Sequence, residues 1–168
     1  MIYKKSWKYI LIKDDYYWCE KYKYGRLKAI KDFSNITKGD LGGYIQGYHN
    51  LSQKGDCWVD IDAVVREDAE VSDNALVYET AEVWGNARIT GNARVYGFSQ
   101  VYGNAIVCEN ARIYEEAVVS GNAVVSGNAE AGRMAWISND ILVCDNAKVY
   151  GCAVTSGKSK IFGDMVIY

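Results

Sequence analysis

The stretch VWGNARITGNARVYG, residues 83–97, repeats one short phrase. Val83, Ile89 and Val95 are six residues apart, and a Gly-Asn-Ala trio lies between each pair. Helices place apolar residues three and four positions apart, so this period does not indicate a helix. It fits a short β-branched strand followed by a tight turn, because Gly and Asn adopt positive φ readily. The stretch therefore predicts a solenoid made of short strands and turns.

The same period continues on both sides of this stretch, from Val59 to Ile161, without a slip in register. Sixteen of its eighteen positions are Val or Ile, the exceptions being Ala131 and Thr155, and the residue four places later is Ala in fourteen of eighteen. One β-branched and one small residue facing inward in each hexad indicate a narrow, packed interior. Side chains alternate along a strand, so the residues flanking each Val face outward.

The motif V-x-G-N-A-x resembles the hexapeptide repeat of left-handed parallel β-helices, a family typified by bacterial transferases. The resemblance implies that three hexads form one triangular coil of about 18 residues. It also implies a left-handed β-helix of about six coils over residues 59–168. We expect residues 1–58 to form a β-hairpin cap, because they lack the hexad and the end of a solenoid exposes unpaired strand edges. The fold class predicted is thus all-β.

The segments GDLGGYI (39–45) and GDCWV (55–59), placed before repeats of the GNARVYGNA type, resemble a group of small bacterial and phage-borne β-helix proteins. This second resemblance covers nearly the whole chain but carries no catalytic motif. It implies an accessory protein that binds and inhibits a component of its bacterial host, for example one used in defence.

If each coil has 18 residues, residues 18 apart in the sequence stack on successive coils and form a column. Comparing these columns distinguishes positions that build the fold from positions specialised for another role. Two corner columns are rich in asparagine and predict hydrogen-bonded ladders, whereas the third lacks the Gly-Asn turn and is flanked by aromatic residues. Large rigid aromatic side chains are enriched at binding surfaces, although stacked rings also support exposed strands. The predicted partner-binding residues are Tyr78, Tyr96, Phe98, Tyr114, Trp136 and Tyr150.

A different outward column contains Ile106, Val124 and Leu142. A contiguous apolar strip on the surface usually marks an interface. Hexapeptide-repeat proteins commonly form parallel trimers, so the resemblance also favours a homotrimer. The alternative is a monomer in which the cap covers the strip.

The sequence offers little for catalysis. Many hexapeptide-repeat proteins are acyltransferases with a catalytic histidine, and the only candidate for that role is His49, which we interpret as a turn or cap residue. A three-histidine zinc site is excluded by the single histidine, and no metal or cofactor is expected. A set of acidic residues is expected to form a solvated face: Glu67, Asp73, Glu79, Glu109, Glu115 and Glu116.

Charge and composition set the remaining limits. Residues 59–168 hold 8 Lys and Arg against 15 Asp and Glu, which argues against a dedicated DNA-binding protein. The five cysteines are scattered, and no apolar stretch is long enough for a membrane span or signal peptide, so we expect a protein of the bacterial cytoplasm.

The leading hypothesis is a non-catalytic protein that binds a host protein through its aromatic edge. Three alternatives are open: an acyltransferase, a trimer that sequesters a small nucleotide, and a structural module.

Overall fold

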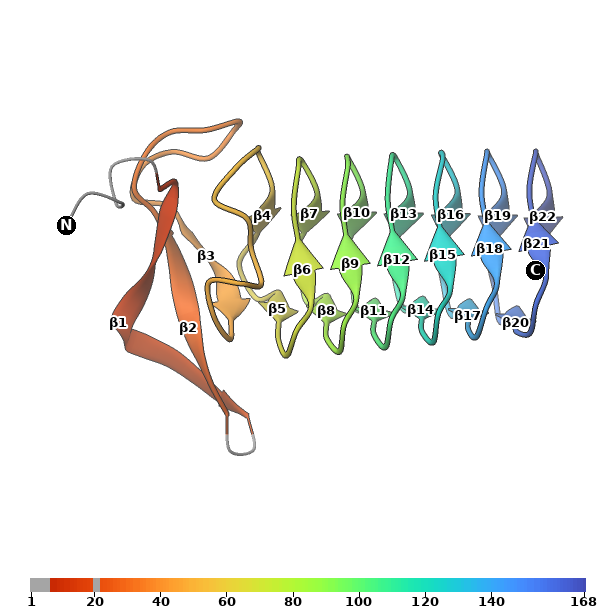
Figure 1. The fold of residues 1–168 in the computed structure, drawn as a ribbon, viewed down its shortest axis with the longest axis horizontal. Helices are drawn as coiled ribbons and strands as arrows, with labels where there is room; N and C mark the ends of the chain where they lie inside the picture. Colours follow the sequence, from red (N-terminus) through yellow and green to blue (C-terminus); the bar gives the residue numbers. More distant parts are fainter. Residues whose placement is uncertain (1–6, 20–21) are drawn as a thin grey trace.

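The structure is a computed structural model that describes residues 7–19 and 22–168. An antiparallel hairpin lies at one end of a long parallel β-solenoid, and no described residue is helical (Figure 1). The predicted all-β solenoid with an N-terminal β cap is confirmed. The described residues accordingly contain no helix long and apolar enough to cross a membrane.

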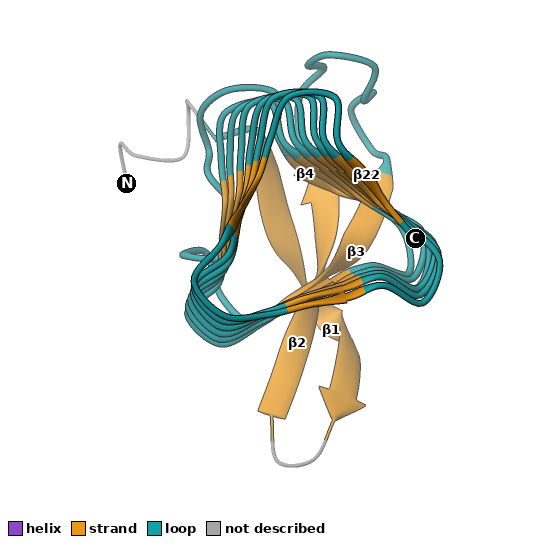
Figure 2. Cartoon of the chain, turned by 90° about the vertical axis from the view of Figure 1, so that its right-hand side faces the viewer, coloured by secondary structure: helices purple, strands orange, loops and turns teal. Residues whose placement is uncertain are grey.

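Three sheets run along the solenoid and form the sides of a triangular prism, seen along its axis in Figure 2. The first sheet has nine strands, in the order β1 (Tyr9–Cys19), β2 (Tyr22–Ala29), β3 (Leu41–Ile45), β5 (Val64–Val65), β8 (Glu82–Val83), β11 (Gln100–Val101), β14 (Val118–Val119), β17 (Trp136–Ile137) and β20 (Val154–Thr155). The second sheet has seven, in the order β22 (Val166–Ile167), β19 (Lys148–Val149), β16 (Glu130–Ala131), β13 (Arg112–Ile113), β10 (Arg94–Val95), β7 (Leu76–Val77) and β4 (Trp58–Val59). The third sheet has six, in the order β21 (Lys160–Ile161), β18 (Leu142–Val143), β15 (Val124–Val125), β12 (Ile106–Val107), β9 (Arg88–Ile89) and β6 (Glu70–Val71).

The strands of neighbouring coils pair in parallel with partners 18 residues apart, as in Val95 with Ile113. Each coil thus visits the second, first and third sheets in turn and then returns to the second. We call the corner between the second and first sheets the aromatic corner. The corner between the first and third sheets, and the corner between the third and second sheets, are the first and second asparagine corners.

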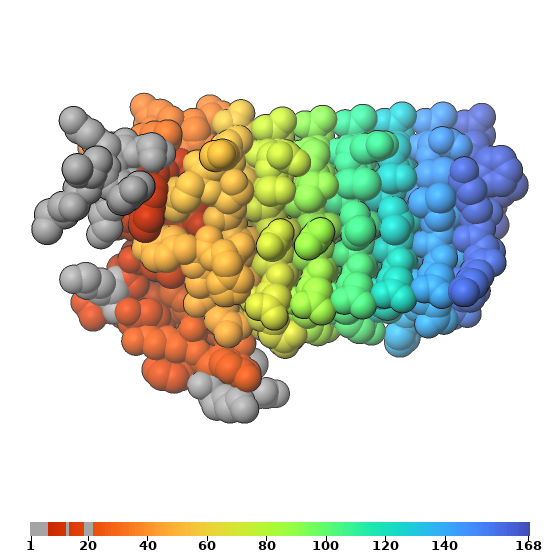
Figure 3. All heavy atoms as spheres, in the orientation of Figure 1, coloured from red at the N-terminus to blue at the C-terminus, as the bar shows by residue number. Residues whose placement is uncertain are grey.

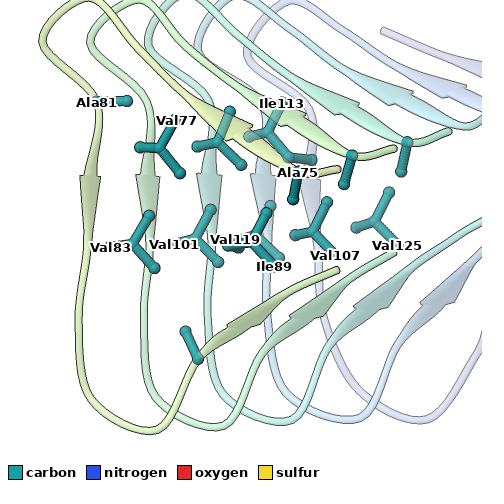
Figure 4. Packing of buried hydrophobic residues seen from close by; sticks show 14 of the residues in the cluster. Ala75, Val77, Ala81, Val83, Ile89, Val101, Val107, Ile113, Val119 and Val125 are labelled. Carbon is teal, nitrogen blue, oxygen red and sulfur yellow. The ribbon is translucent and has the colours of Figure 1, made fainter. Parts of the chain in front are cut away.

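The core is a column of inward-facing Val, Ile and Ala side chains. Val83, Ile89 and Val95 have no exposed surface, and neither have the small residues Ala87 and Ala93. Figure 4 shows buried side chains from the three sheets, among them Val77, Val83 and Ile89, meeting along the axis. Because each buried Val or Ile stabilises the fold by about 1.5–3 kcal/mol, the regular hexad supplies a continuous core along the prism.

The parallel pairing begins before Val59, where the hexad pattern starts. Strand β3 pairs in parallel with β5, and Leu51 forms a parallel bridge with Val71, so β3, Leu51 and β4 make a first coil and the solenoid has seven. Leu51 and Val59 are eight positions apart, two more than in a hexad, so the hexad pattern does not reveal this coil in the sequence. Gly43, in β3 of this first coil, lies so close to the next coil that an added Cβ would be 2.3 Å from the carbonyl oxygen of Ala63.

The cap is fastened to the first coil by a buried lysine. Lys8 is 1% exposed, and its Nζ donates hydrogen bonds to the carbonyl oxygens of Cys57 (2.7 Å) and Gly55 (3.0 Å). It also lies 3.2 Å from the Cys57 sulfur. Burial lowers the pKa of Lys8 and raises the pKa of the Cys57 thiol. The ammonium group therefore holds the enlarged turn of the first coil in place by its carbonyl groups.

The described part of the cap lies at one end of the molecule (Figure 3). In Figure 1 it stands apart from β12, β15 and β18, which carry the apolar strip. The described part of the cap therefore does not cover that strip, and residues 1–6, 20 and 21 of the cap lie outside the described residues.

Candidate functional site

The two asparagine corners carry the predicted amide ladders. At the second asparagine corner, Asn92 Nδ2 donates to Asn110 Oδ1 (3.0 Å) and Asn110 Nδ2 to Asn128 Oδ1 (3.1 Å). At the first, Asn86 donates to Asn104 (3.0 Å) and Asn104 to Asn122 (2.9 Å) in the same way. Both corners are therefore structural, as the columns predicted.

Acidic residues at these two corners have a role that the sequence did not reveal. Glu67 and Glu109 have positive φ, 57° and 59°, at a turn position that is glycine in other coils. The Glu109 carboxylate accepts a hydrogen bond from the backbone N–H of Gly127 (2.7 Å), and Glu67 accepts one from Gly85 (3.0 Å). These residues are exposed, as predicted for a solvated face, and their carboxylates also bind the next coil.

Among the described residues, the aromatic corner has neither an amide ladder nor carboxylates that bind the next coil. Glu79 and Glu115 have the same turn conformation, with φ of 58° and 55°. Among the described residues, neither carboxylate forms a hydrogen bond or an ion pair with the next coil. At this corner, carboxylates are thus left available to a partner.

The predicted tyrosine ladder runs along this corner. Tyr78 and Tyr96 are stacked with ring centroids 4.7 Å apart and planes at 4°, and Tyr96 and Tyr114 are stacked at 5.4 Å. The ladder then changes at Gly132, where an added Cβ would lie 2.6 Å from the Tyr114 ring. Tyr114 therefore covers Gly132, and it meets Tyr150 edge-on at 6.3 Å.

Glu130 fixes the C-terminal half of the ladder. The hydroxyl groups of Tyr150 and Tyr114 both donate to Glu130 Oε2, the latter over 3.4 Å, and Lys148 Nζ lies 3.6 Å from the same oxygen. Burial raises the pKa of Tyr150 well above its usual value, and its hydrogen bond to Glu130 acts in the same direction. Within the described chain, the hydroxyl groups of Tyr78 and Tyr96 have no such partner.

Apolar side chains are exposed beside this ladder. Phe98 is 69% exposed, Met134 56% and Trp136 46%. Phe98 and Met134 border a hollow of about 550 Å³ together with Tyr96. Its other lining residues are Glu79, Gly97, Glu115, Glu116 and Arg133. The hollow thus combines an apolar floor with three carboxylates and one guanidinium group.

The six predicted partner-binding residues all belong to this edge but do not share one hollow. Tyr96 and Phe98 border the hollow just described. Trp136 does not border it and lies on strand β17 of the first sheet. Tyr114 and Tyr150 border a smaller one of about 260 Å³. Tyr78 borders another beside the cap. The structure therefore brings them to one edge of the prism, in three adjacent places.

The predicted oligomer strip is continuous. Ile106 pairs with Val124, and Val124 pairs with Leu142, on adjacent strands of the third sheet. All three side chains are half-buried. They form an apolar row on the outer face of that sheet.

His49 lies in an exposed turn just before the first coil closes. Its Nε2 is 2.7 Å from the carbonyl oxygen of Glu67, an acceptor that requires Nε2 to carry the proton. This hydrogen bond fits the interpretation of His49 as a turn residue. No three His, Cys, Asp or Glu side chains of the described residues are grouped as metal ligands.

One aromatic column was missed by the sequence reasoning. Trp84 and Tyr102 stack at 4.6 Å near the first asparagine corner, and the Arg66 guanidinium lies 4.6 Å from the Trp84 ring centroid. The three residues are 18 positions apart, so reading that column would have found them.

Comparison with known proteins supports the β-solenoid repeat but gives no activity, ligand or partner. A family model described as the YdcK beta solenoid repeat matches residues 99–115, about one coil. No curated protein matches the chain. The match identifies a β-solenoid repeat in this chain, whereas its activity has to be inferred from the surface.

Proposed function

We propose that the protein is a non-catalytic binding protein that docks a partner protein on its aromatic corner. The observation that carries this proposal is the exposure of Phe98 and Met134 at one hollow, with the exposed Trp136 on the adjacent strand β17, at the only corner of the described solenoid without an amide ladder. Exposed apolar clusters with an aromatic centre commonly act as the energetic centre of an interface.

The charges around the hollow indicate the chemistry of the partner. Glu79, Glu115 and Glu116 face one guanidinium group, that of Arg133, and none of them forms an ion pair in the described part of the chain. Complementary charges increase the association rate and select among partners. The proposed partner therefore presents an apolar side chain for the hollow and Lys or Arg side chains around it.

We also propose where the protein acts in the cell and how many copies of it assemble. The resemblance to phage-borne β-helix proteins supports a partner from a bacterial host, and the cytoplasm is the proposed location because the four cysteines whose side chains are described are free thiols. The apolar row of Ile106, Val124 and Leu142 supports a homotrimer joined through the third sheet. The acyltransferase alternative has less support, since Nε2 of His49 is engaged by a backbone carbonyl.

A photocrosslinking amino acid at position 98 tests the docking proposal in an expressing bacterium. The protein captured there is purified and titrated against the unmodified chain. Phe98→Ala and Trp136→Ala are each expected to weaken binding about tenfold, as for central aromatic residues of an interface. Tyr102→Ala is the matched control at another corner and is expected to leave the affinity unchanged.

Two results would overturn the docking proposal. One is a partner whose affinity is unchanged when Tyr96, Tyr114 and Trp136 are all replaced by Ala. The other is an equal loss of affinity in the Tyr102 control, which would show a general effect on the fold.

A further inference from the structure

Two adjacent arginines on the second sheet form no ion pair in the described chain, although Glu130 follows Arg112 in the same register. Arg94 on β10 and Arg112 on β13 are direct neighbours in the parallel register, with strands about 4.8 Å apart, and both are exposed. Like charges placed opposite each other on neighbouring strands are destabilising. The ion pairs of the described residues include neither arginine. An anion placed between the two guanidinium groups would relieve this repulsion.

Two tyrosine hydroxyl groups lie beside the arginine pair. Burial raises the pKa of Tyr78 and of Tyr96, while Arg94 and Arg112 near Tyr78, and Arg112 near Tyr96, act in the opposite direction. Arg94 and Tyr78 border the same hollow, and Tyr96 lies two positions after Arg94, so that both side chains face outward on one coil. Both hydroxyl groups remain protonated at neutral pH and can donate hydrogen bonds. The surface therefore offers four donor groups on three successive coils, an arrangement suited to the oxygens of a phosphoryl group.

A hollow of about 420 Å³ adjoins this pair where the cap meets the solenoid. Arg94 and Tyr78 border it, as do the apolar residues Ile36, Leu76 and Trp58. Trp58 is 2% exposed, and its indole N–H has no hydrogen-bond partner in the described chain. A buried donor without a partner costs about 1–3 kcal/mol. Asn35 and Asp60 add polar groups at the same hollow.

We propose that this junction binds a small phosphorylated ligand with a planar ring. Arg94, Arg112 and the two tyrosine hydroxyl groups hold the phosphoryl group, and the ring enters the hollow between the cap and β7. A small anion fits better than a nucleic acid, because the row of arginines is only two residues long and ends at Glu130, the next residue in register after Arg112. This site shares Tyr96 with the rim of the docking hollow around Phe98, but it does not depend on the function proposed for that hollow.

Isothermal titration of the full chain with ATP and with inorganic pyrophosphate tests the site. ATP is expected to bind at least tenfold more tightly than pyrophosphate, because only ATP carries a ring for the hollow. Arg94→Gln and Arg112→Gln are each expected to weaken ATP binding about tenfold. The matched control is Arg88→Gln, an exposed arginine at the same position of a strand in the third sheet, which should change the affinity less than twofold.

A second measurement localises the ring. In a ¹H–¹⁵N spectrum, the indole signal of Trp58 is expected to shift on addition of ATP while that of Trp84, on another face, stays in place. Phe98→Ala should leave both measurements unchanged, which separates this site from the docking surface.

Several outcomes would overturn the proposal. They are no binding of either probe, an equal loss of affinity in Arg88→Gln, equal affinity for pyrophosphate and ATP, or an unmoved Trp58 signal. The first two would reject the anion site, and the last two would reject the hollow as the site of the ring.

Discussion

Glu109 provides a direct test of how the solenoid replaces glycine in its turns. Its φ of 59° costs an ordinary residue about 1 kcal/mol, and its carboxylate accepts the Gly127 N–H at 2.7 Å. A hydrogen bond to a charged group stabilises by about 1.5–3 kcal/mol, less here because Glu109 is exposed. The bond and the strain therefore nearly cancel in the native protein.

Two substitutions separate these contributions. Glu109→Ala keeps the strained conformation and loses the hydrogen bond, so we expect a loss of about 1–1.5 kcal/mol. Glu109→Gly loses the bond but also the strain, so the expected change is within about 0.5 kcal/mol. The matched control is Glu79→Ala, with φ of 58° and no such bond among the described residues, which should cost little.

Urea unfolding followed by circular dichroism measures all three variants. Solenoids can unfold in several steps, so midpoints are compared only among variants with the same slope. The reasoning is refuted if the Ala and Gly variants at position 109 are equally stable, or if Glu79→Ala is as destabilising as Glu109→Ala.

Four further changes test other parts of the molecule. Ser99→Ala should raise stability by about 1 kcal/mol in urea unfolding, since the buried Ser99 hydroxyl has no hydrogen-bond partner among the described residues; a loss would contradict this. Lys8→Met should cost about 3 kcal/mol and speed hydrogen exchange in the cap, because buried carbonyl groups lose their donor; unchanged exchange would argue against this role. Gly103→Ala should cost at least about 1 kcal/mol in urea unfolding, since its φ is 74° and the new Cβ would lie 3.0 Å from the Gly121 nitrogen; native-like stability would refute the steric reasoning. Val124→Glu should turn a trimer into a monomer in native mass spectrometry, and a wild-type monomer would reject the trimer.

The hexad determined most of the fold because each repeat satisfies the same local requirement. Val83, Ile89 and Val95 must face a narrow interior, and the turn after each must adopt positive φ, so an unbroken register leaves one architecture. The first coil was missed for a physical reason. Its extra two residues between Leu51 and Val59 are stabilised by the Lys8 ammonium group, a long-range contact with no periodic signal.

The candidate site was predictable only where it follows the 18-residue column. Tyr78 and Tyr96 stack as the column implies, since their rings lie on successive coils. Glu130 could not be assigned, because it binds Tyr114 and Tyr150 across columns, at separations of 16 and 20 residues. Side-chain reach, and not backbone register, decides such contacts.

The difference between the corners is the strongest argument that the aromatic corner has a function. At the asparagine corners, polar side chains such as Asn110 and Glu109 are used to bind the next coil, so their hydrogen-bonding groups are occupied. At the aromatic corner, the backbone makes the same turns, yet Glu79 and Glu115 form no such bonds in the described chain and Phe98 is largely exposed. The described part of this corner therefore lacks the hydrogen-bonded ladder that stabilises each of the other two corners. Such a local departure from an otherwise consistent pattern is typical of a surface kept for binding.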